Sequence, residues 1–135
     1  GKVGVEEADV VVAAGKGIGS PSNLNWVYEL AALLGGAVGA SRAVVDLGWL
    51  SYPHQVGLSG KTVSPRLYIA CGISGAIQHL AGMRGSELVI AINKDPRAQI
   101  FKVADLGVVG DLAEILPRLV QRLRELRGDA GGEGA

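Results

Sequence analysis

Short apolar runs alternate with amphipathic stretches along the chain. Five of these runs have the length and the continuous apolar character of strands that are covered on both faces. They lie at 8–14, 37–40, 67–71, 87–92 and within 103–109. Runs of this kind separated by helical segments are typical of an α/β fold.

Helical signals fill most of the intervals between the runs. Ser20 followed by Pro21 is typical of a helix start, and apolar residues then recur at helical spacing as far as Gly35. Shorter helices are expected at 43–50 and at 75–81. The sequence therefore places a helix or a turn after each of the first three strands.

The last helix is predicted from its cap and its apolar stripe. Asp111 is a good N-cap residue, and Glu114 three positions later completes the pattern of a capping box. Leucines continue the stripe as far as Leu126. Pro117 lies inside this pattern, and we expect it to kink the helix or to mark its true start.

Strands that alternate with helices predict a Rossmann-like, doubly wound parallel sheet of about five to six strands with helices on both faces. Residues 1–127 are expected to form one domain. The glycine-rich segment 128–135 lacks a core pattern, and we expect it to be disordered.

Polar and glycine-rich segments follow the predicted strands. Because ligands of such sheets bind at the carboxyl ends of the strands, these segments should gather beside one crevice. They are residues 15–20, 41–42, 72–79, 93–95 and 110–112. The arrangement predicts a nucleotide-cofactor site, in which Ser74 caps the third helix and the start of that helix faces a phosphate.

The stretch QVGLSGKTV at 55–63 resembles a phosphate-binding loop of nucleotide hydrolases, but its context is wrong. That loop needs a glycine where Gln55 stands, with a buried strand before it and a helix after it. Pro65 prevents a helix from starting at Lys61. We therefore reject the hydrolase interpretation.

Composition narrows the function classes. The formal net charge is +0, so we expect neither nucleic-acid binding nor direct insertion into a membrane, and no secretory leader is visible. The single Cys71 fits a reducing compartment. Cys71, His54 and His79 lack the spacing of metal ligands, so no metal is expected. No constellation of catalytic residues is visible.

The first turn, GKGIG, is a partial dinucleotide fingerprint, because Ser20 stands where its third glycine would be. The second strand ends in Ser41 and Arg42 rather than in the acidic residue that binds the ribose of NAD. The residues therefore disfavour NAD and leave NADP and FAD open.

Three stretches together resemble a known family. They are GASRAVVDLGW at 39–49, QVGLSGKTVSPRLYIACGISGAIQHLAGM at 55–83 and VIAINKDPRAQIFKVADLGVVGDL at 89–112. With the closing helix they resemble the C-terminal domain of the electron transfer flavoprotein α subunit. The resemblance implies an FAD-binding domain that is joined in the intact protein to an N-terminal domain and a β subunit.

The resemblance also implies which residues contact FAD. Arg42 would lie over the isoalloxazine ring with Ser41 beside it, Ser59 would lie near flavin N5, and a protonated His79 near the C2 carbonyl. Arg42 and His79 would then stabilise the extra electron on the flavin. The full implied set is Lys16, Ser41, Arg42, Gln55, Val56, Gly57, Leu58, Ser59, Ser74, Gly75, Ala76, Ile77, Gln78, His79, Asn93, Asp111 and Leu112.

Three positions depart from the family pattern. Lys16 replaces an arginine, Leu58 stands where glutamine is common, and Ser59 where threonine is common. Lys16 keeps the charge but loses the bidentate fork.

The family carries electrons singly from dehydrogenases to a membrane-bound quinone oxidoreductase. The resemblance implies an electron carrier rather than an enzyme, these redox partners, and a place in the bacterial cytoplasm or the mitochondrial matrix. Two alternatives remain open at this point: an NADP-binding Rossmann module, and a cofactor-free domain that only binds a partner subunit.

Overall fold

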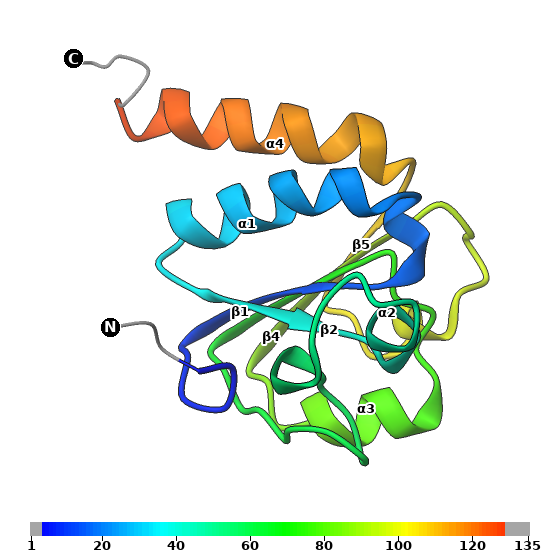
Figure 1. Ribbon diagram of the computed structural model, residues 1–135. Coiled ribbons are helices and arrows are strands. Elements are labelled where there is room, and N and C mark those ends of the chain that lie inside the picture. The colour runs from blue at the N-terminus through cyan, green and yellow to red at the C-terminus, as the bar shows by residue number, and fades with distance from the viewer. Residues whose placement is uncertain (1–3, 129–135) are drawn as a thin grey trace.

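Five parallel strands form one sheet in the computed structural model, which describes residues 4–128 (Figure 1). Their order across the sheet is β2-β1-β3-β4-β5. They are β1 (Val10–Ala14), β2 (Ala37–Ala40), β3 (Leu67–Cys71), β4 (Leu88–Asn93) and β5 (Leu106–Val109). The predicted α/β fold and parallel sheet are confirmed. Residues 129–135, most of the segment expected to be disordered, lie outside the described residues.

Side chains of the central strands alternate between two cores, as the two-residue period of a strand requires. Val12 and Ala14 face one core, while Val11 and Ala13 face the other, and all four are fully buried. This explains why β1 reads as a continuous apolar run rather than an alternating one.

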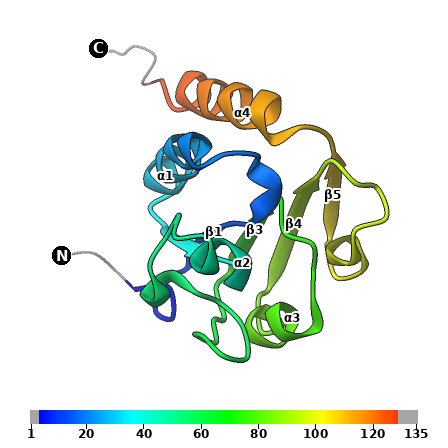
Figure 2. The ribbon, with the colours of Figure 1, turned by 45° about the vertical axis from the view of Figure 1, so that its right-hand side comes forward.

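Two helices, α1 (Leu24–Leu33) and α4 (Leu112–Leu126), lie side by side on one face of the sheet (Figures 1 and 2). An ion pair between Arg124 and Glu29 joins their exposed sides. The Asp111 carboxylate caps α4 by accepting a hydrogen bond of 3.0 Å from the Ala113 N–H, as predicted. α4 begins at Leu112 and continues past Pro117, so the prediction that Pro117 marks the true start of the helix is wrong.

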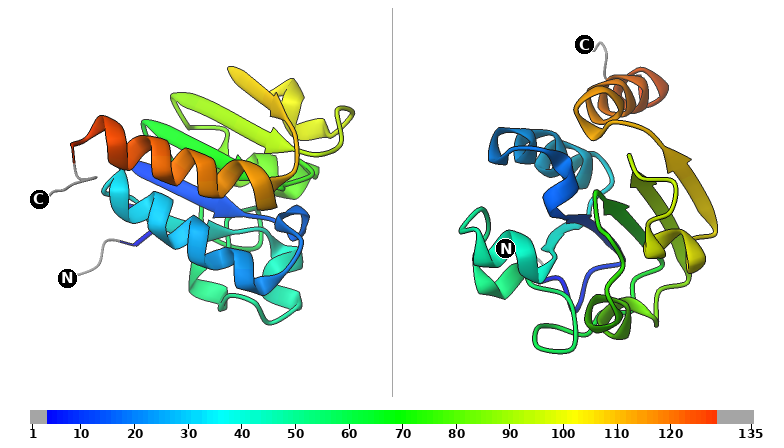
Figure 3. Two further views of the ribbon diagram at one scale, coloured as in Figure 1. Left: turned by 90° about the horizontal axis from the view of Figure 1, so that it is seen from above. Right: turned by 90° about the vertical axis from the view of Figure 1, so that its right-hand side faces the viewer.

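The other face is covered by the short helix α3 (Ile77–Met83) and by the loop 51–66, which contains a 3-10 helix at Tyr52–His54 (Figures 1 and 3). The loop packs closely against α3, because a Cβ on Gly82 would lie 2.4 Å from the backbone nitrogen of Gly57. Helices therefore lie on both faces, two long ones on one face and the short α3 on the other. A further short helix, α2 (Arg42–Asp46), follows β2, where a short helix or turn was predicted at 43–50.

The prediction that Ser74 caps a helix at 75–81 is wrong. The helix begins at Ile77, and its N-cap residue is Ala76. Gly75 has φ +93°, and the Ser74 carbonyl accepts a hydrogen bond of 2.9 Å from the Ile100 N–H. A contact with a distant segment thus holds residues 72–76 as a loop.

The segment after β1 contains a 3-10 helix at Lys16–Ile18. As predicted, Ser20 is an N-cap residue and Pro21 the first helical residue, but they begin a second 3-10 helix, Pro21–Asn23, that leads directly into α1. The Ser20 side chain makes no capping bond. Within residues 4–128, no helix is both long and apolar enough to cross a membrane.

Candidate functional site

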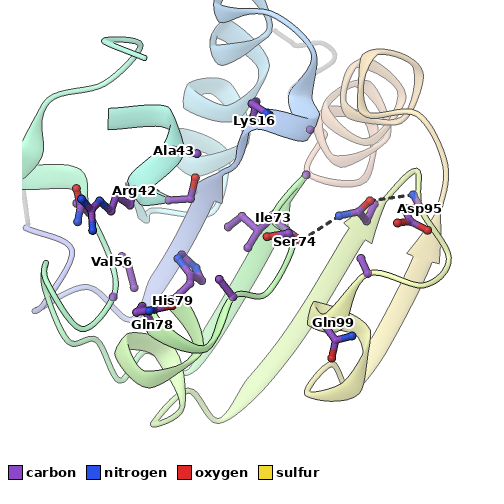
Figure 4. Close-up of a pocket in the computed structure, with 18 of the residues that line it drawn as sticks. Lys16, Arg42, Ala43, Val56, Ile73, Ser74, Gln78, His79, Asp95 and Gln99 are labelled. Atoms are coloured by element: carbon purple, nitrogen blue, oxygen red, sulfur yellow. Dashed lines mark hydrogen bonds between the residues drawn. The ribbon is translucent and has the colours of Figure 1, made fainter. Parts of the chain in front are cut away.

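A cavity of about 770 Å³ lies at the carboxyl end of the sheet (Figure 4). The chain passes from β1 to β2 on one side of β1 and then returns to place β3 on the other side. The strand order therefore reverses between β1 and β3, which is where ligands bind in open α/β sheets. The volume is within the range of small-molecule sites.

The ends of β1 and β3 touch at this point. The Gly17 N–H donates a hydrogen bond of 2.9 Å to the Gly72 carbonyl. A Cβ on Gly72, which has φ +69°, would lie 2.5 Å from the carbonyl carbon of Gly17. Glycine is therefore required for the two strand ends to meet behind the cavity.

Most of the residues expected to contact FAD line this cavity. They are Lys16, Ser41, Arg42, Gln55, Val56, Gly57, Leu58, Ser59, Ser74, Ala76, Gln78, His79 and Asn93. Segments far apart in the sequence are thus brought together by the sheet.

Four expected residues do not line the cavity. Gly75 packs against Ile100, and Ile77 is 78% exposed. Leu112 is fully buried in the core beneath α4, and the Asp111 carboxylate is engaged in capping that helix. The segment 110–112 follows β5, the edge strand, and α4 contacts the 3-10 helix Lys16–Ile18 that follows β1. Contacts of these four residues with FAD stay predictions.

Sequence reasoning missed part of the cavity wall that follows β4. The predicted segment 93–95 includes Asp95, but the wall continues through Arg97, Ala98 and Gln99. The turn residues after the strand carried a signal for this wall, because they had to lie at the same sheet edge as 72–79. Ala43 was also missed, whereas Gly17, Gly72 and Ile73 lie within segments predicted to border the crevice.

Three cationic side chains and one carboxylate line the cavity: Lys16, Arg42, Arg97 and Asp95. The whole chain has no net charge, so this excess of positive charge is local. Arg42 pairs with Asp46 at 3.5 Å, but the two side chains are 72% and 65% exposed. A solvent-exposed pair of this kind is weak, and Arg42 remains available to an anionic ligand.

The loop that carries Gln55–Ser59 is held between β2 and α3 by its backbone. The Val56 N–H donates to the Ala40 carbonyl at 2.9 Å, and the Leu58 N–H donates to the Gln78 carbonyl at 2.8 Å. The Gln55 side-chain amide donates to the Ser59 hydroxyl at 3.1 Å. The structure also excludes a phosphate-binding loop of the nucleotide-hydrolase kind at 55–63. A 3-10 helix rather than a strand precedes these residues, and β3 rather than a helix follows them.

Asn93 links two walls of the cavity. Its side-chain amide donates to the Ile73 carbonyl at 3.0 Å, and its side-chain oxygen accepts from the Asp95 N–H at 2.9 Å (Figure 4). Both polar groups are therefore already engaged, and Asn93 shapes the loops after β3 and β4.

His79 is the polar side chain that the cavity leaves without a complete set of partners. It is 6% exposed, and its Nε2 lies 2.7 Å from the hydroxyl oxygen of Tyr68. Its Nδ1 is buried and has no hydrogen-bond partner. An orphaned buried polar atom in a cavity wall is costly unless a ligand completes it.

The expectation of a protonated His79 is corrected by its environment. Burial lowers the pKa of His79 to about 4, against a smaller raising effect from the backbone of Val56. The imidazole is therefore neutral near pH 7. Of Arg42 and His79, the two residues expected to face the flavin, only Arg42 therefore brings a positive charge.

Cys71 is buried in β3, and burial raises its pKa to about 12. A buried thiol with a raised pKa is a poor nucleophile, so Cys71 is not suited to a redox role. Among residues 4–128, no group of three or more histidine, cysteine or acidic side chains is placed to hold a metal ion.

Residues 4–84 match the family described as "Electron transfer flavoprotein FAD-binding domain". The chain is 59% identical over 125 residues to a protein of Thermoanaerobacterium thermosaccharolyticum named electron transfer flavoprotein subunit alpha, covering 93% of this chain and 38% of that one. A protein of the same name from Bacillus subtilis is 53% identical over 124 residues, covering 92% and 38%. The chain thus spans about two fifths of the length of these relatives.

A solved structure shares the fold at low identity. The structure titled as Sir2Af2 bound to a myristoylated histone peptide has a TM-score of 0.52 and 14% identity, and the match covers 89% of this chain and 92% of that one. At this identity the likeness concerns the fold alone.

Proposed function

The chain belongs to the family of electron transfer flavoprotein FAD-binding domains, and we propose that the cavity at its β1/β3 switch point is where this chain holds FAD. The bound FAD would supply the isoalloxazine ring that takes up and releases electrons. The chain would then act as a domain of an electron carrier rather than as an enzyme.

One observation carries the proposal: the wall of the cavity combines excess positive charge with an unpartnered ring nitrogen. Lys16, Arg42 and Arg97 line it with only one carboxylate. FAD contains an anionic pyrophosphate and a flat ring with hydrogen-bond acceptors along one edge. The residues present therefore suit both of its ends.

The residues of this chain would divide the work of binding. Gly57 has φ +148° and lies in the cavity wall, so backbone rather than a side chain faces a flat ring there. Arg42 would supply a fixed positive charge that favours electron uptake. Ser41 accepts a long bond of 3.4 Å from the Val44 N–H, which leaves its hydroxyl proton free to donate.

Lys16 and Arg97 would contribute to pyrophosphate binding from opposite sides of the cavity. Lys16 follows β1, and Arg97 follows β4. Both side chains are exposed, so their contribution would depend on salt. The remaining lining residues, Ser59, Ser74, Ala76 and Gln78 among them, would contact FAD from the loops.

The partners proposed for the complete protein follow from its family. They are an electron transfer flavoprotein β subunit, dehydrogenases as electron donors and a membrane-bound quinone oxidoreductase as acceptor. The exposure of Leu58 supports the proposal of a partner subunit, because this apolar side chain lines the cavity and is nevertheless 74% exposed. A second chain that covered Leu58 would also close the site to water.

The test is a fluorescence titration of FAD with the purified chain and two variants. Arg42→Ala removes a cavity cation, and Arg118→Ala makes the same change on the exposed side of α4. We expect Arg42→Ala to weaken binding by roughly tenfold, which corresponds to about 1.4 kcal/mol, and Arg118→Ala to leave it unchanged.

The titration is repeated with NADP⁺ and with the β subunit of a relative present. Binding of NADP⁺ without binding of FAD under either condition would replace the proposal by the NADP-binding alternative. Binding of neither nucleotide, with or without the β subunit, would favour a cofactor-free interaction domain.

A further inference from the structure

We propose that Tyr68 is a positioning residue that keeps the proton of His79 on Nδ1, so that a neutral ring presents an N–H donor to the ligand in the cavity. The state of the ring is a property of this chain alone. The identity of the ligand as FAD rests on the proposed function above.

The geometry places Tyr68 behind His79 as seen from the cavity. Tyr68 comes from the middle of β3, is fully buried and does not line the cavity, whereas His79 comes from α3 and does. Their rings meet edge to face, with centroids 6.0 Å apart and an interplanar angle of 61°. The hydroxyl therefore reaches only the inner nitrogen, Nε2, at 2.7 Å.

Hydrogen-bond accounting then selects one tautomer. If the Tyr68 O–H donates to Nε2, the proton of the ring is on Nδ1, and only the Nδ1–H lacks a partner. If Nε2–H instead donates to the Tyr68 oxygen, Nδ1 becomes an acceptor without a partner and the buried phenolic proton loses its acceptor as well. The first arrangement leaves one buried polar group unsatisfied and the second leaves two, so the first is favoured.

Burial reinforces this arrangement on both sides. It raises the pKa of Tyr68 well above its ordinary value, so the hydroxyl keeps its proton and remains a donor. It also lowers the pKa of His79 to about 4, so the ring stays neutral. The groups that face this pair are the backbone of Val56, which raises the pKa of His79, and the buried thiol of Cys71, which raises the pKa of Tyr68. The charged residues that line the cavity are Lys16, Arg42, Asp95 and Arg97.

The consequence concerns which ligand atom can face His79. A neutral Nδ1–H can serve only an acceptor, such as a carbonyl oxygen or an unprotonated ring nitrogen. Its hydrogen bond strengthens when that acceptor gains negative charge, because charge-assisted hydrogen bonds are the stronger ones. His79 would thus favour a ligand that takes up an electron without itself binding or releasing a proton.

The direct test is nitrogen NMR of the ¹⁵N-labelled chain at neutral pH, without any ligand. The chain has two histidines, and His54 serves as an internal reference. Its Nδ1 lies 2.8 Å from the Val38 carbonyl oxygen, which can only accept, so the Nδ1 of His54 carries a proton. We expect His79 to show a protonated Nδ1 as well, with an unprotonated Nε2. A protonated Nε2 in His79 would overturn the proposal.

Two variants separate positioning from packing. Tyr68→Phe removes the hydroxyl and keeps the ring, whereas Tyr28→Phe makes the same change on the exposed side of α1. In Tyr68→Phe no bond fixes the proton of His79, and we expect Nε2–H to become populated. Tyr28→Phe should keep the wild-type spectrum. If Tyr68→Phe folds with His79 still wholly protonated on Nδ1, Tyr68 does not position it. If Tyr68→Phe does not fold, the wild-type spectrum alone decides.

FAD titration of the same variants shows whether the ligand uses the N–H. We expect FAD affinity to fall by about fivefold in Tyr68→Phe, the effect of one hydrogen bond, and to be unchanged in Tyr28→Phe. Equal affinity of wild type and Tyr68→Phe would overturn the role toward the ligand. Absence of FAD binding to the wild type, with Nδ1–H observed, would refute the proposed function and leave the tautomer established.

Discussion

Acidification should destabilise this protein through His79 before its carboxylates are protonated. Burial holds the pKa of His79 near 4 in the folded state, and the ordinary value of about 6.5 applies to the unfolded chain. The unfolded state therefore binds a proton at a higher pH than the folded state. The contribution of His79 to stability is complete when the pH is above its pKa in the unfolded chain. It is lost as the pH falls toward its pKa in the folded state.

The magnitude follows from these two values. The free energy of unfolding should fall by about 2 kcal/mol between about pH 7 and about pH 5 on account of His79 alone, and by about 3 kcal/mol at about pH 4. His79 is 6% exposed, so solvent screening reduces this effect little. A loss of this size is a large part of the stability of a small domain.

Urea denaturation at a series of pH values measures the effect. His79→Asn removes the titrating ring and should flatten the pH dependence by about 2 kcal/mol over the same interval, even if the variant is less stable at neutral pH. His54→Asn is the matched control, and the wild-type slope should persist in it because His79 remains. Equal slopes for wild type and His79→Asn would refute the burial of a neutral ring.

Three further predictions concern the site and the core. Arg42→Ala should lower the one-electron potential of bound FAD, by about 59 mV for each ~1.4 kcal/mol of lost interaction. Chemical denaturation should show a stability within ~0.5 kcal/mol of wild type, because the ion pair of Arg42 with Asp46 is exposed. Leu112→Ala should lower the free energy of unfolding by about 2–5 kcal/mol, with unchanged FAD affinity of the folded molecules; a selective loss of affinity would restore Leu112 to the binding site. Cys71 should not react with a thiol reagent in the native chain and should react fully in denaturant, since burial raises its pKa to about 12; rapid labelling of the native chain would contradict this.

The sequence predicted those parts of the fold that depend on local patterns. The bounds of β2 and β3 agree with their predictions, because each is an apolar run too short for a helix and is ended by Ser41 or Gly72. The cap of α4 was likewise predicted from Asp111. Each of these features is decided by residues within a few positions of one another.

The failures have long-range causes. The start of α3 was placed too early, because the bond between the Ser74 carbonyl and the Ile100 N–H joins segments that no local pattern connects. Pro117 was expected to kink its helix or to mark its true start, but α4 already begins at Leu112. Leu116 and Val120 are fully buried on either side of Pro117, and their packing keeps α4 continuous.

The site shows the same division. Resemblance to a family named Arg42 and His79, and both line one cavity. It also named Asp111 and Leu112, which do not line that cavity, so their contact with FAD stays a prediction. The neutrality of His79 could not be foreseen, since it depends on burial and on a hydrogen bond to Tyr68 eleven residues earlier.

Titration of FAD into the ¹⁵N-labelled chain, followed through its backbone amide signals, tests the central claim most directly. If the switch-point cavity holds FAD, the signals that move should belong to its walls, at 15–17, 41–43, 55–59, 72–79 and 93–99. Movement confined to α4 or to the loop at 110–112, or no movement at saturating FAD while the chain stays folded, would contradict the account.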